Sequence, residues 1–267
     1  MAEVIGPSVR ELGAEQWFFI RYWQAGPHVR LRVRDLDARS VERFERGLQA
    51  RLATAGALAA DEPPLDEAAY RDGARRFAMS ELGQTDAVED LRAPGVYRAE
   101  YVPEVDRYGG PELTASTERL FHLSSELVLA LLPDLSTPRA RSVIAIRGTI
   151  SAAAALGDRT VQAHFYAESL KAWRSWAADF GCTEPELDRL CEVGRPRVDS
   201  VDPNDHGIFA DWNSAIADLA AEAQRTGALH MGRVVFSHVH MLHNRIGRSL
   251  FEELATYAWL ARVFPVT

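Results

Sequence analysis

Two short stretches near the N-terminus alternate between apolar and polar residues as β-strands do. WFFIRYW, over 17–23, is rich in aromatic residues, and HVRLRV, over 28–33, alternates with a period of two. The sequence QAGP between them is typical of a turn, so the two stretches predict an antiparallel hairpin. In the second stretch His28, Arg30 and Arg32 share one face, and the apolar residues between them share the other.

Most of the chain after the hairpin has the apolar spacing of amphipathic helices. Residues 95–110, GVYRAEYVPEVDRYGG, instead predict a strand followed by an irregular segment that ends in glycines. The first fifteen residues are expected to be a short lead-in, and residues 193–208 the main loop. The expected helices cover 37–56, 66–82, 112–132, 136–156, 159–180, 209–226, 231–246 and 249–263.

The order of these elements, strands early and helices late, favours an α+β fold. We expect a small, mainly antiparallel sheet with an N-terminal hairpin, covered by several long helices. The chain has 267 residues, which is enough to bury a large core, and we expect a single domain over 1–267.

Composition narrows the possible functions. The net charge of −8 argues against a general nucleic-acid binder, whose surface would be basic. No apolar run reaches the roughly 18 residues that span a bilayer, and the N-terminus has no export-signal pattern. Cys182 and Cys191 form neither a disulfide framework nor a metal motif. A cytoplasmic protein with reduced thiols is therefore expected.

The cationic face of the predicted hairpin has two interpretations. Its guanidinium groups are either solvated and balanced by nearby acids such as Asp35 and Asp37, or they hold an anion. The second interpretation has a clear chemical basis, because the forked guanidinium pairs with carboxylates through two hydrogen bonds. Spacing alone leaves both interpretations open.

The segment YVPEVDRYGG raises a similar question at Arg107 and Tyr108. Glu104 and Asp106 flank Arg107, so an ion pair that orders the turn is the simpler explanation. The segment also presents an arginine and a tyrosine beside two glycines, and glycines allow a ligand to approach the backbone closely.

The sequence SHVHMLHNRIGRS, over 237–249, is the third candidate. On a helix His240, His243, Asn244 and Gly247 lie on one face. A metal site is not favoured, because the helix lacks the carboxylate of an HExxH motif. A histidine on a polar helix face is suited to proton transfer, although most such histidines are structural. The usual nucleophile and nucleotide-binding motifs are absent from the sequence.

These three stretches, in this order, resemble the lantibiotic dehydratase C-terminal domain, which is also found as a stand-alone thiopeptide-type bacteriocin biosynthesis protein. The resemblance implies a lyase that removes glutamate from glutamylated Ser and Thr of a precursor peptide and leaves dehydroalanine or dehydrobutyrine. It also implies that a separate protein, using glutamyl-tRNA, attaches the glutamate first. Neither a cofactor nor a metal is implied.

The resemblance further implies a set of site residues. Arg30 matches the first family arginine, with Arg32 as the near alternative, Arg107 matches the second, and His240 matches the family histidine. His240 would take or relay the α-proton, and the arginines would bind glutamyl carboxylates and stabilise developing charge. Expected substrate-binding residues are His28, Arg32, Tyr108, Asn244 and Arg245.

Two other functions remain open. The same fold serves pyridine synthases, which join two dehydroalanines by formal cycloaddition and are expected to lack the arginine and histidine set. The other alternative is a non-catalytic adaptor that presents the peptide to the glutamylating partner and is indifferent to loss of His240. The precursor peptide and the glutamylating protein are the expected partners, with neither nucleic acid nor membrane bound directly. A homodimer is left open.

Overall fold

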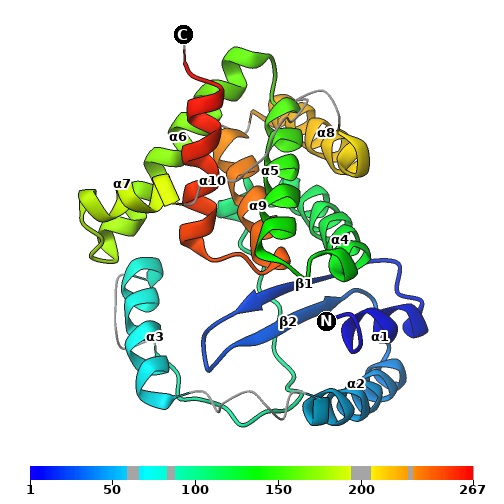
Figure 1. Cartoon of the computed structure of the whole chain (residues 1–267). Helices are drawn as coiled ribbons and strands as arrows, with labels where there is room; N and C mark the ends of the chain where they lie inside the picture. The colour runs from blue at the N-terminus through cyan, green and yellow to red at the C-terminus, as the bar shows by residue number, and fades with distance from the viewer. Residues whose placement is uncertain (59–65, 83–87, 194–205, 228–230, 267) are drawn as a thin grey trace. The chain divides into compact units, whose positions relative to one another are not determined.

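The computed structural model describes residues 1–58, 66–82, 88–193, 206–227 and 231–266. The chain divides into two compact units, Met1–Val102 and Pro103–Thr267. Figure 1 shows the elements of both units along the chain. None of the described helices is long and apolar enough to cross a bilayer.

The described residues of the first unit form the predicted hairpin and three helices. Strands β1 (Trp17–Tyr22) and β2 (His28–Val33) pair antiparallel, with Tyr22 opposite His28 and Trp17 opposite Val33. The turn places Gly26 at φ 102°, a left-handed conformation that glycine adopts without strain. The helices of this unit are α1 (Ile5–Leu12), α2 (Ala38–Leu58) and α3 (Glu67–Leu82).

The second unit is helical in its described residues. Short 3₁₀ turns η1 (Asp106–Tyr108) and η2 (Pro111–Leu113) lead into the helices, and η3 (Leu132–Asp134) and η4 (Gly207–Phe209) connect later ones. The helices are α4 (Thr114–Leu131), α5 (Pro138–Ala154), α6 (Arg159–Asp179), α7 (Glu184–Val193), α8 (Ala210–Thr226), α9 (Met231–Ile246) and α10 (Leu250–Val263).

Helix α9 lies inside this unit, against α4 and α5, while α10 packs against α6 and α7. Close approach of α5 to α9 depends on Gly148, because a Cβ there would lie 2.9 Å from Phe209 and closer still to Leu242. Leu242 and Phe209 are fully buried. The central position of α9 fixes its side chains in a well-packed environment.

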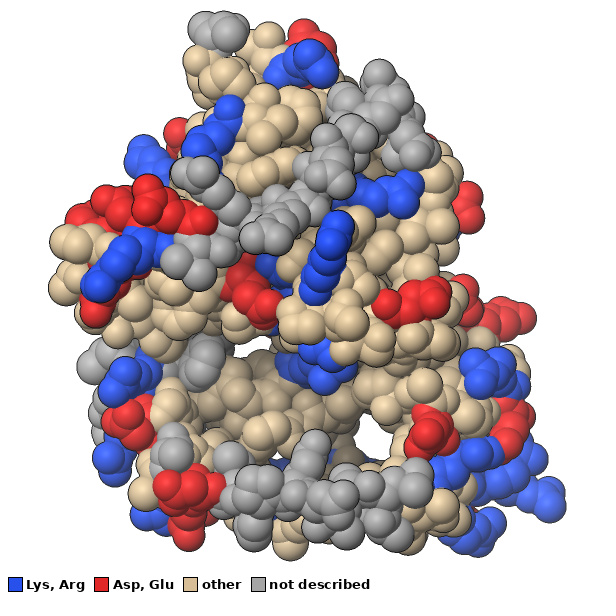
Figure 2. All heavy atoms as spheres, in the orientation of Figure 1, with Lys and Arg blue, Asp and Glu red and all other residues tan. Residues whose placement is uncertain are grey.

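Local signals in the sequence set the starts of the helices around this core. The Asp158 carboxylate caps α6 by accepting hydrogen bonds from the backbone N–H groups of Thr160 and Val161, at 3.0 and 3.1 Å. Ser249 and Glu252 form a capping box at the start of α10. Acidic side chains gather over α7 (Figure 2), where Arg174 of α6 pairs with Asp188 at 3.1 Å.

The α+β class, the hairpin and the eight predicted helices are confirmed, with small shifts at their ends. The strand predicted from residue 95 is wrong: residues 95–102 have no regular secondary structure, and Tyr97 and Val102 are exposed. Helices α1 and α7 were not predicted. The GPS sequence in the first turn of α1 resembles a break, although proline is tolerated there. Most of the predicted loop 193–208 lies outside the described residues.

Candidate active site

Arg107 is held at the edge of the second unit by a sharp turn. Gly109 and Gly110 follow it with φ values of 89° and 108°, so the turn itself requires these glycines. The Arg107 guanidinium pairs with Glu104 at 3.0 Å, as the simpler explanation of the sequence predicted. Its Nε also donates to Ser237 Oγ of α9 at 3.5 Å, a long hydrogen bond. The turn therefore places a cation directly beside α9.

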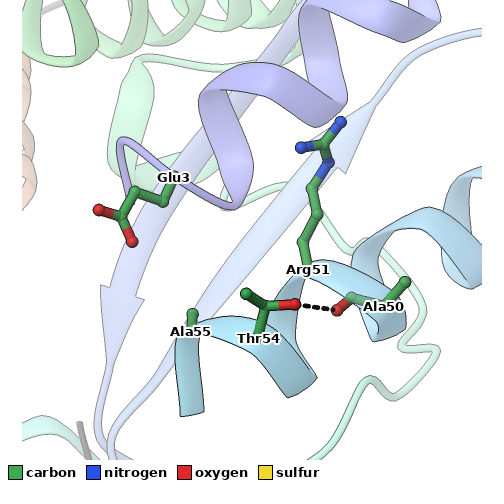
Figure 3. A pocket seen from close by; sticks show the side chains of 5 residues that line it. All are labelled: Glu3, Ala50, Arg51, Thr54 and Ala55. Atoms are coloured by element: carbon green, nitrogen blue, oxygen red, sulfur yellow. Dashed lines mark hydrogen bonds between the residues drawn. The ribbon is translucent and has the colours of Figure 1, made fainter. Parts of the chain in front are cut away.

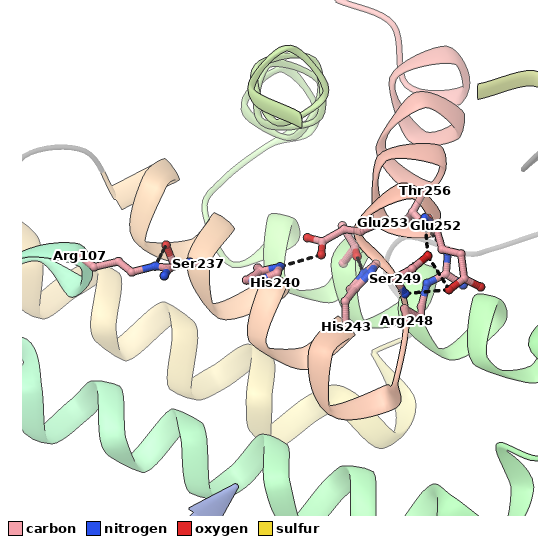
Figure 4. Close-up of polar contacts among 10 residues, drawn as sticks. Arg107, Ser237, His240, His243, Arg248, Ser249, Glu252, Glu253 and Thr256 are labelled. Atoms are coloured by element: carbon pink, nitrogen blue, oxygen red, sulfur yellow. Dashed lines mark hydrogen bonds and ion pairs between the residues drawn. The ribbon is translucent and has the colours of Figure 1, made fainter. Parts of the chain in front are cut away.

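His240 lies one turn further along α9, and its side chain is 16% exposed. Its Nδ1 is 2.9 Å from Oε2 of Glu253 on α10. The Trp173 ring of α6 lies beside the imidazole, with centroids 5.4 Å apart. In Figure 4, Ser237 and His240 lie on α9, with Arg107 on one side of them and Glu253 of α10 on the other. Arg107 thus contacts α9 one helical turn before His240, although the two predicted site residues lie more than a hundred positions apart in the sequence.

Glu253 was missed by the sequence analysis. It is 1% exposed, and burial tends to raise its pKa, but the neighbouring His240 and His243 outweigh this and leave the pKa below its usual value. One signal could have found it, because Leu250, Leu254 and Tyr257 share its helix face. A glutamate within an apolar stripe needs a buried partner.

The other two histidines of α9 are buried. His243 Nε2 is 3.0 Å from Thr149 Oγ1 of α5, and burial lowers the pKa of His243 to about 4. His238 packs against the rings of Tyr108 and Phe121, and burial lowers its pKa to about 3. Both imidazoles are therefore neutral at physiological pH, and His240 is the partly exposed histidine of this helix.

Two of the expected substrate-binding residues lie in the interior. Arg245 is fully buried, donates from Nε to Ser125 Oγ at 3.0 Å and has its pKa lowered by burial to about 9. Tyr108 is 5% exposed, and burial raises its pKa to about 12. Neither side chain reaches the surface in this conformation, so both support the packing around α9. Asn244 is half-buried on the same helix.

The hairpin of the first unit carries the remaining predicted residues. Arg30 lies over the Tyr22 ring at 3.5 Å, and its Nε donates to His28 Nε2 at 3.2 Å. Arg32 lies 5.5 Å from the Tyr101 ring. Burial, and then the charge of Arg30, lower the pKa of Arg32. Cation–π contacts of this kind hold a guanidinium in place without neutralising it.

The strand register shows that the hairpin face with Arg30 and Arg32 is not purely polar. Arg30 stands opposite Ile20, and Arg32 opposite Phe18, so the cationic face also carries apolar side chains. Arg21 stands opposite Val29 on the other face. The cations of β2 are thus set among aromatic and aliphatic groups rather than gathered on a purely polar surface.

A separate small pocket of the first unit lies between α2 and the segment that precedes α1 (Figure 3). Glu3, Ala50, Arg51, Thr54 and Ala55 line it, and Arg51 forms an ion pair with Glu11. The pocket contains none of the predicted site residues. Among the described residues, no three histidine, cysteine, aspartate or glutamate side chains are grouped as metal ligands.

The chain is similar to three solved structures. The pyridine synthase TbtD from thiomuracin biosynthesis is 18% identical with a TM-score of 0.67, covering 100% of this chain and 94% of that chain. TsrL is 15% identical with a TM-score of 0.60, covering 98% and 88%. The tRNA-dependent lantibiotic dehydratase MibB from Microbispora sp. 107891 is 20% identical with a TM-score of 0.59. That match covers 98% of this chain but only 26% of MibB.

At these identities the structural likeness shows the fold alone. No curated protein matches the sequence at a significant level. The family model described as lantibiotic biosynthesis dehydratase C-term matches residues 1–264. The chain belongs to this family, and the match runs through both compact units, which confirms the resemblance noted in the sequence.

Proposed function

We propose that the protein is a lyase that eliminates glutamate from O-glutamylated Ser or Thr of a ribosomally made precursor peptide. The product is dehydroalanine or dehydrobutyrine, and a separate glutamyl-tRNA-dependent protein supplies the ester. The observation that carries the proposal is the contact of Arg107 with Ser237 of α9, one helical turn before the partly exposed His240. A cation and an imidazole on the same stretch of a helix are the groups that β-elimination needs.

The chemistry divides into proton removal and departure of the leaving group. His240 takes the α-proton of the glutamylated residue and becomes an imidazolium. The electron pair of the broken Cα–H bond forms the Cα–Cβ double bond, the Cβ–O bond breaks, and glutamate leaves as a carboxylate. Because the leaving group is a stable anion, no strong general acid is needed. The imidazolium then returns its proton to water.

The arginines act on negative charge in this scheme. Arg107 stabilises the enolate-like oxygen that develops on the peptide carbonyl as the α-proton leaves. Arg30 of β2 binds a carboxylate of the glutamyl group. Among the described residues its guanidinium contacts Tyr22 and His28 and forms no ion pair with an acid, so it can pair with a substrate carboxylate. His28, Arg32 and Asn244 are the remaining candidates for contact with the peptide.

The second candidate function is that of a pyridine synthase. It is favoured by the likeness to TbtD, whose length and fold correspond to those of this chain. Glutamate elimination fits the side chains better, because the arginines and His240 expected for elimination are all present. The two functions consume different peptides and can be separated by assay.

The test is mass spectrometry of a synthetic peptide that carries one O-glutamylserine, incubated with wild-type protein or His240→Ala. We expect the wild-type protein to release glutamate and form dehydroalanine, and His240→Ala to be slower by roughly 10²–10⁴-fold, the usual contribution of a general base. His164→Ala is the matched control, because His164 is exposed on α6. Persistence of the ester with wild-type protein would refute elimination, and a peptide with two dehydroalanines would then test ring formation.

A further inference from the structure

The geometry around His240 allows only one of its ring nitrogens to meet a substrate. Nδ1 faces the buried carboxylate of Glu253 at 2.9 Å, on the side of α10 (Figure 4). Because an ionised carboxylate only accepts hydrogen bonds, the Nδ1 position must carry the proton. The lone pair of the neutral ring is then on Nε2, the nitrogen that a base would use. The contact therefore selects one tautomer of the imidazole.

The carboxylate that makes this contact is costly to bury. Glu253 is 1% exposed. The charge of Arg248, in the α9–α10 turn, acts on it, and His240 Nδ1 lies within hydrogen-bond distance of its carboxylate. His243 of α9 also faces Glu253, but its pKa of about 4 leaves it neutral at physiological pH. Without such partners a buried carboxylate is strongly destabilising, so packing alone does not explain a glutamate at this position.

The remaining titratable neighbour of Glu253 is Tyr257 on α10, whose pKa is raised chiefly by burial and then by the charge of Glu253. The Trp173 ring packs against the imidazole from α6. The Trp173 ring therefore restricts the orientation of the His240 imidazole, and the Glu253 carboxylate determines which ring nitrogen carries the proton. Packing alone would explain the first contact but not the second.

We infer that Glu253 is a positioning residue that holds His240 with Nδ1 protonated and stabilises the imidazolium formed when Nε2 accepts a proton. This inference rests on the proposed function for the identity of the reaction. Glu253 itself touches no reacting atom and acts only through His240. Its role corresponds to that of an acid which orients a catalytic histidine.

Two readouts test the inference with the variant Glu253→Gln, which keeps the shape of the side chain and removes the charge. In the elimination assay we expect kcat to fall at least about tenfold while KM stays within about twofold, because the peptide contacts are unchanged. The loss is bounded by the roughly 10²–10⁴-fold that a general base contributes. Glu252→Gln is the matched control, since the Glu252 carboxylate accepts its hydrogen bonds from Ser249 at the start of α10.

The second readout does not depend on the reaction. The ¹⁵N shifts of the His240 ring, identified by their loss in His240→Ala, should show Nδ1 protonated and Nε2 bare in the wild-type protein. Glu253→Gln should give a mixture of tautomers. If the wild-type protein eliminates nothing, the proposed function is wrong, and these shifts alone decide whether Glu253 sets the tautomer.

Unchanged tautomer and unchanged kcat in Glu253→Gln would overturn the inference. If this variant does not fold, Glu253→Asp replaces it, because it retains the charge on a side chain shorter by one methylene. The longer distance to Nδ1 should then lower kcat without a matching rise in KM. A folded Glu253→Asp protein with wild-type kcat would equally overturn the inference.

Discussion

Replacement of Gly148 by alanine tests how tightly α9 is held against α5. The new methyl group would lie 2.9 Å from Cε1 of Phe209 and closer still to Cδ2 of Leu242, whereas real Cβ contacts are longer than 3.0 Å. Both neighbours are fully buried and cannot swing into solvent. The backbone of α5 or α9 must therefore move to accommodate the methyl group.

The magnitude follows from two opposing effects. Overpacking a well-filled core costs about 1–3 kcal/mol, and this contact is at the severe end of that range. Alanine is the better helix former by about 1 kcal/mol, which offsets part of the loss. We therefore expect Gly148→Ala to lower the free energy of unfolding by about 2 kcal/mol. Because α9 carries His240, elimination activity should fall as well.

Urea unfolding followed by circular dichroism measures this difference. The matched control is Gly47→Ala in α2, where nothing lies within 4 Å of the added Cβ. The same substitution there should raise stability by roughly 0.5–1 kcal/mol. Equal or greater stability of Gly148→Ala relative to the wild-type protein would refute the reasoning about α5 and α9.

Two further predictions concern pH and the hairpin. The buried His238 and His243 have pKa values lowered to about 3 and about 4 from 6.5, so below pH 6.5 the unfolded chain binds protons that the folded chain does not. The contribution of these histidines to stability should be complete above pH 6.5 and should be lost as the pH falls toward about 4. Thermal melts should show a smaller loss of stability with falling pH for His243→Asn than for the wild-type protein. A melting temperature that does not depend on pH in this window would contradict the assignment. Arg30→Ala should lower kcat/KM for the glutamylated peptide by roughly 10-fold or more through loss of a charge-assisted pair. Arg34→Ala serves as the control, because Arg34 contacts Gln16 at 2.8 Å and the exposed Asp35 at 3.3 Å. Equal kcat/KM for the two variants would remove Arg30 from the site.

The apolar spacing predicted the helices correctly because this spacing is a local property of each helix. The prediction of a strand at residues 95–102 was wrong because strand formation does not depend on local sequence alone. Alternating apolar and polar residues indicate that a strand is possible, but a strand forms only where a second backbone supplies hydrogen bonds. No partner strand pairs with these described residues. Helix α1 was missed because a glycine and a proline in its first turn resemble a break.

The sequence by itself determined the family, the hairpin and the candidate residues Arg30, Arg107 and His240. It could not tell which histidine of α9 is accessible, because the burial and hydrogen-bond partners of each one depend on α4, α5 and α10. His243 meets Thr149 of α5 and is buried, whereas His240 meets Glu253 of α10 and keeps one face accessible. Burial and partners decide whether an imidazole can carry a proton, and only the packing of helices distant in sequence supplies them.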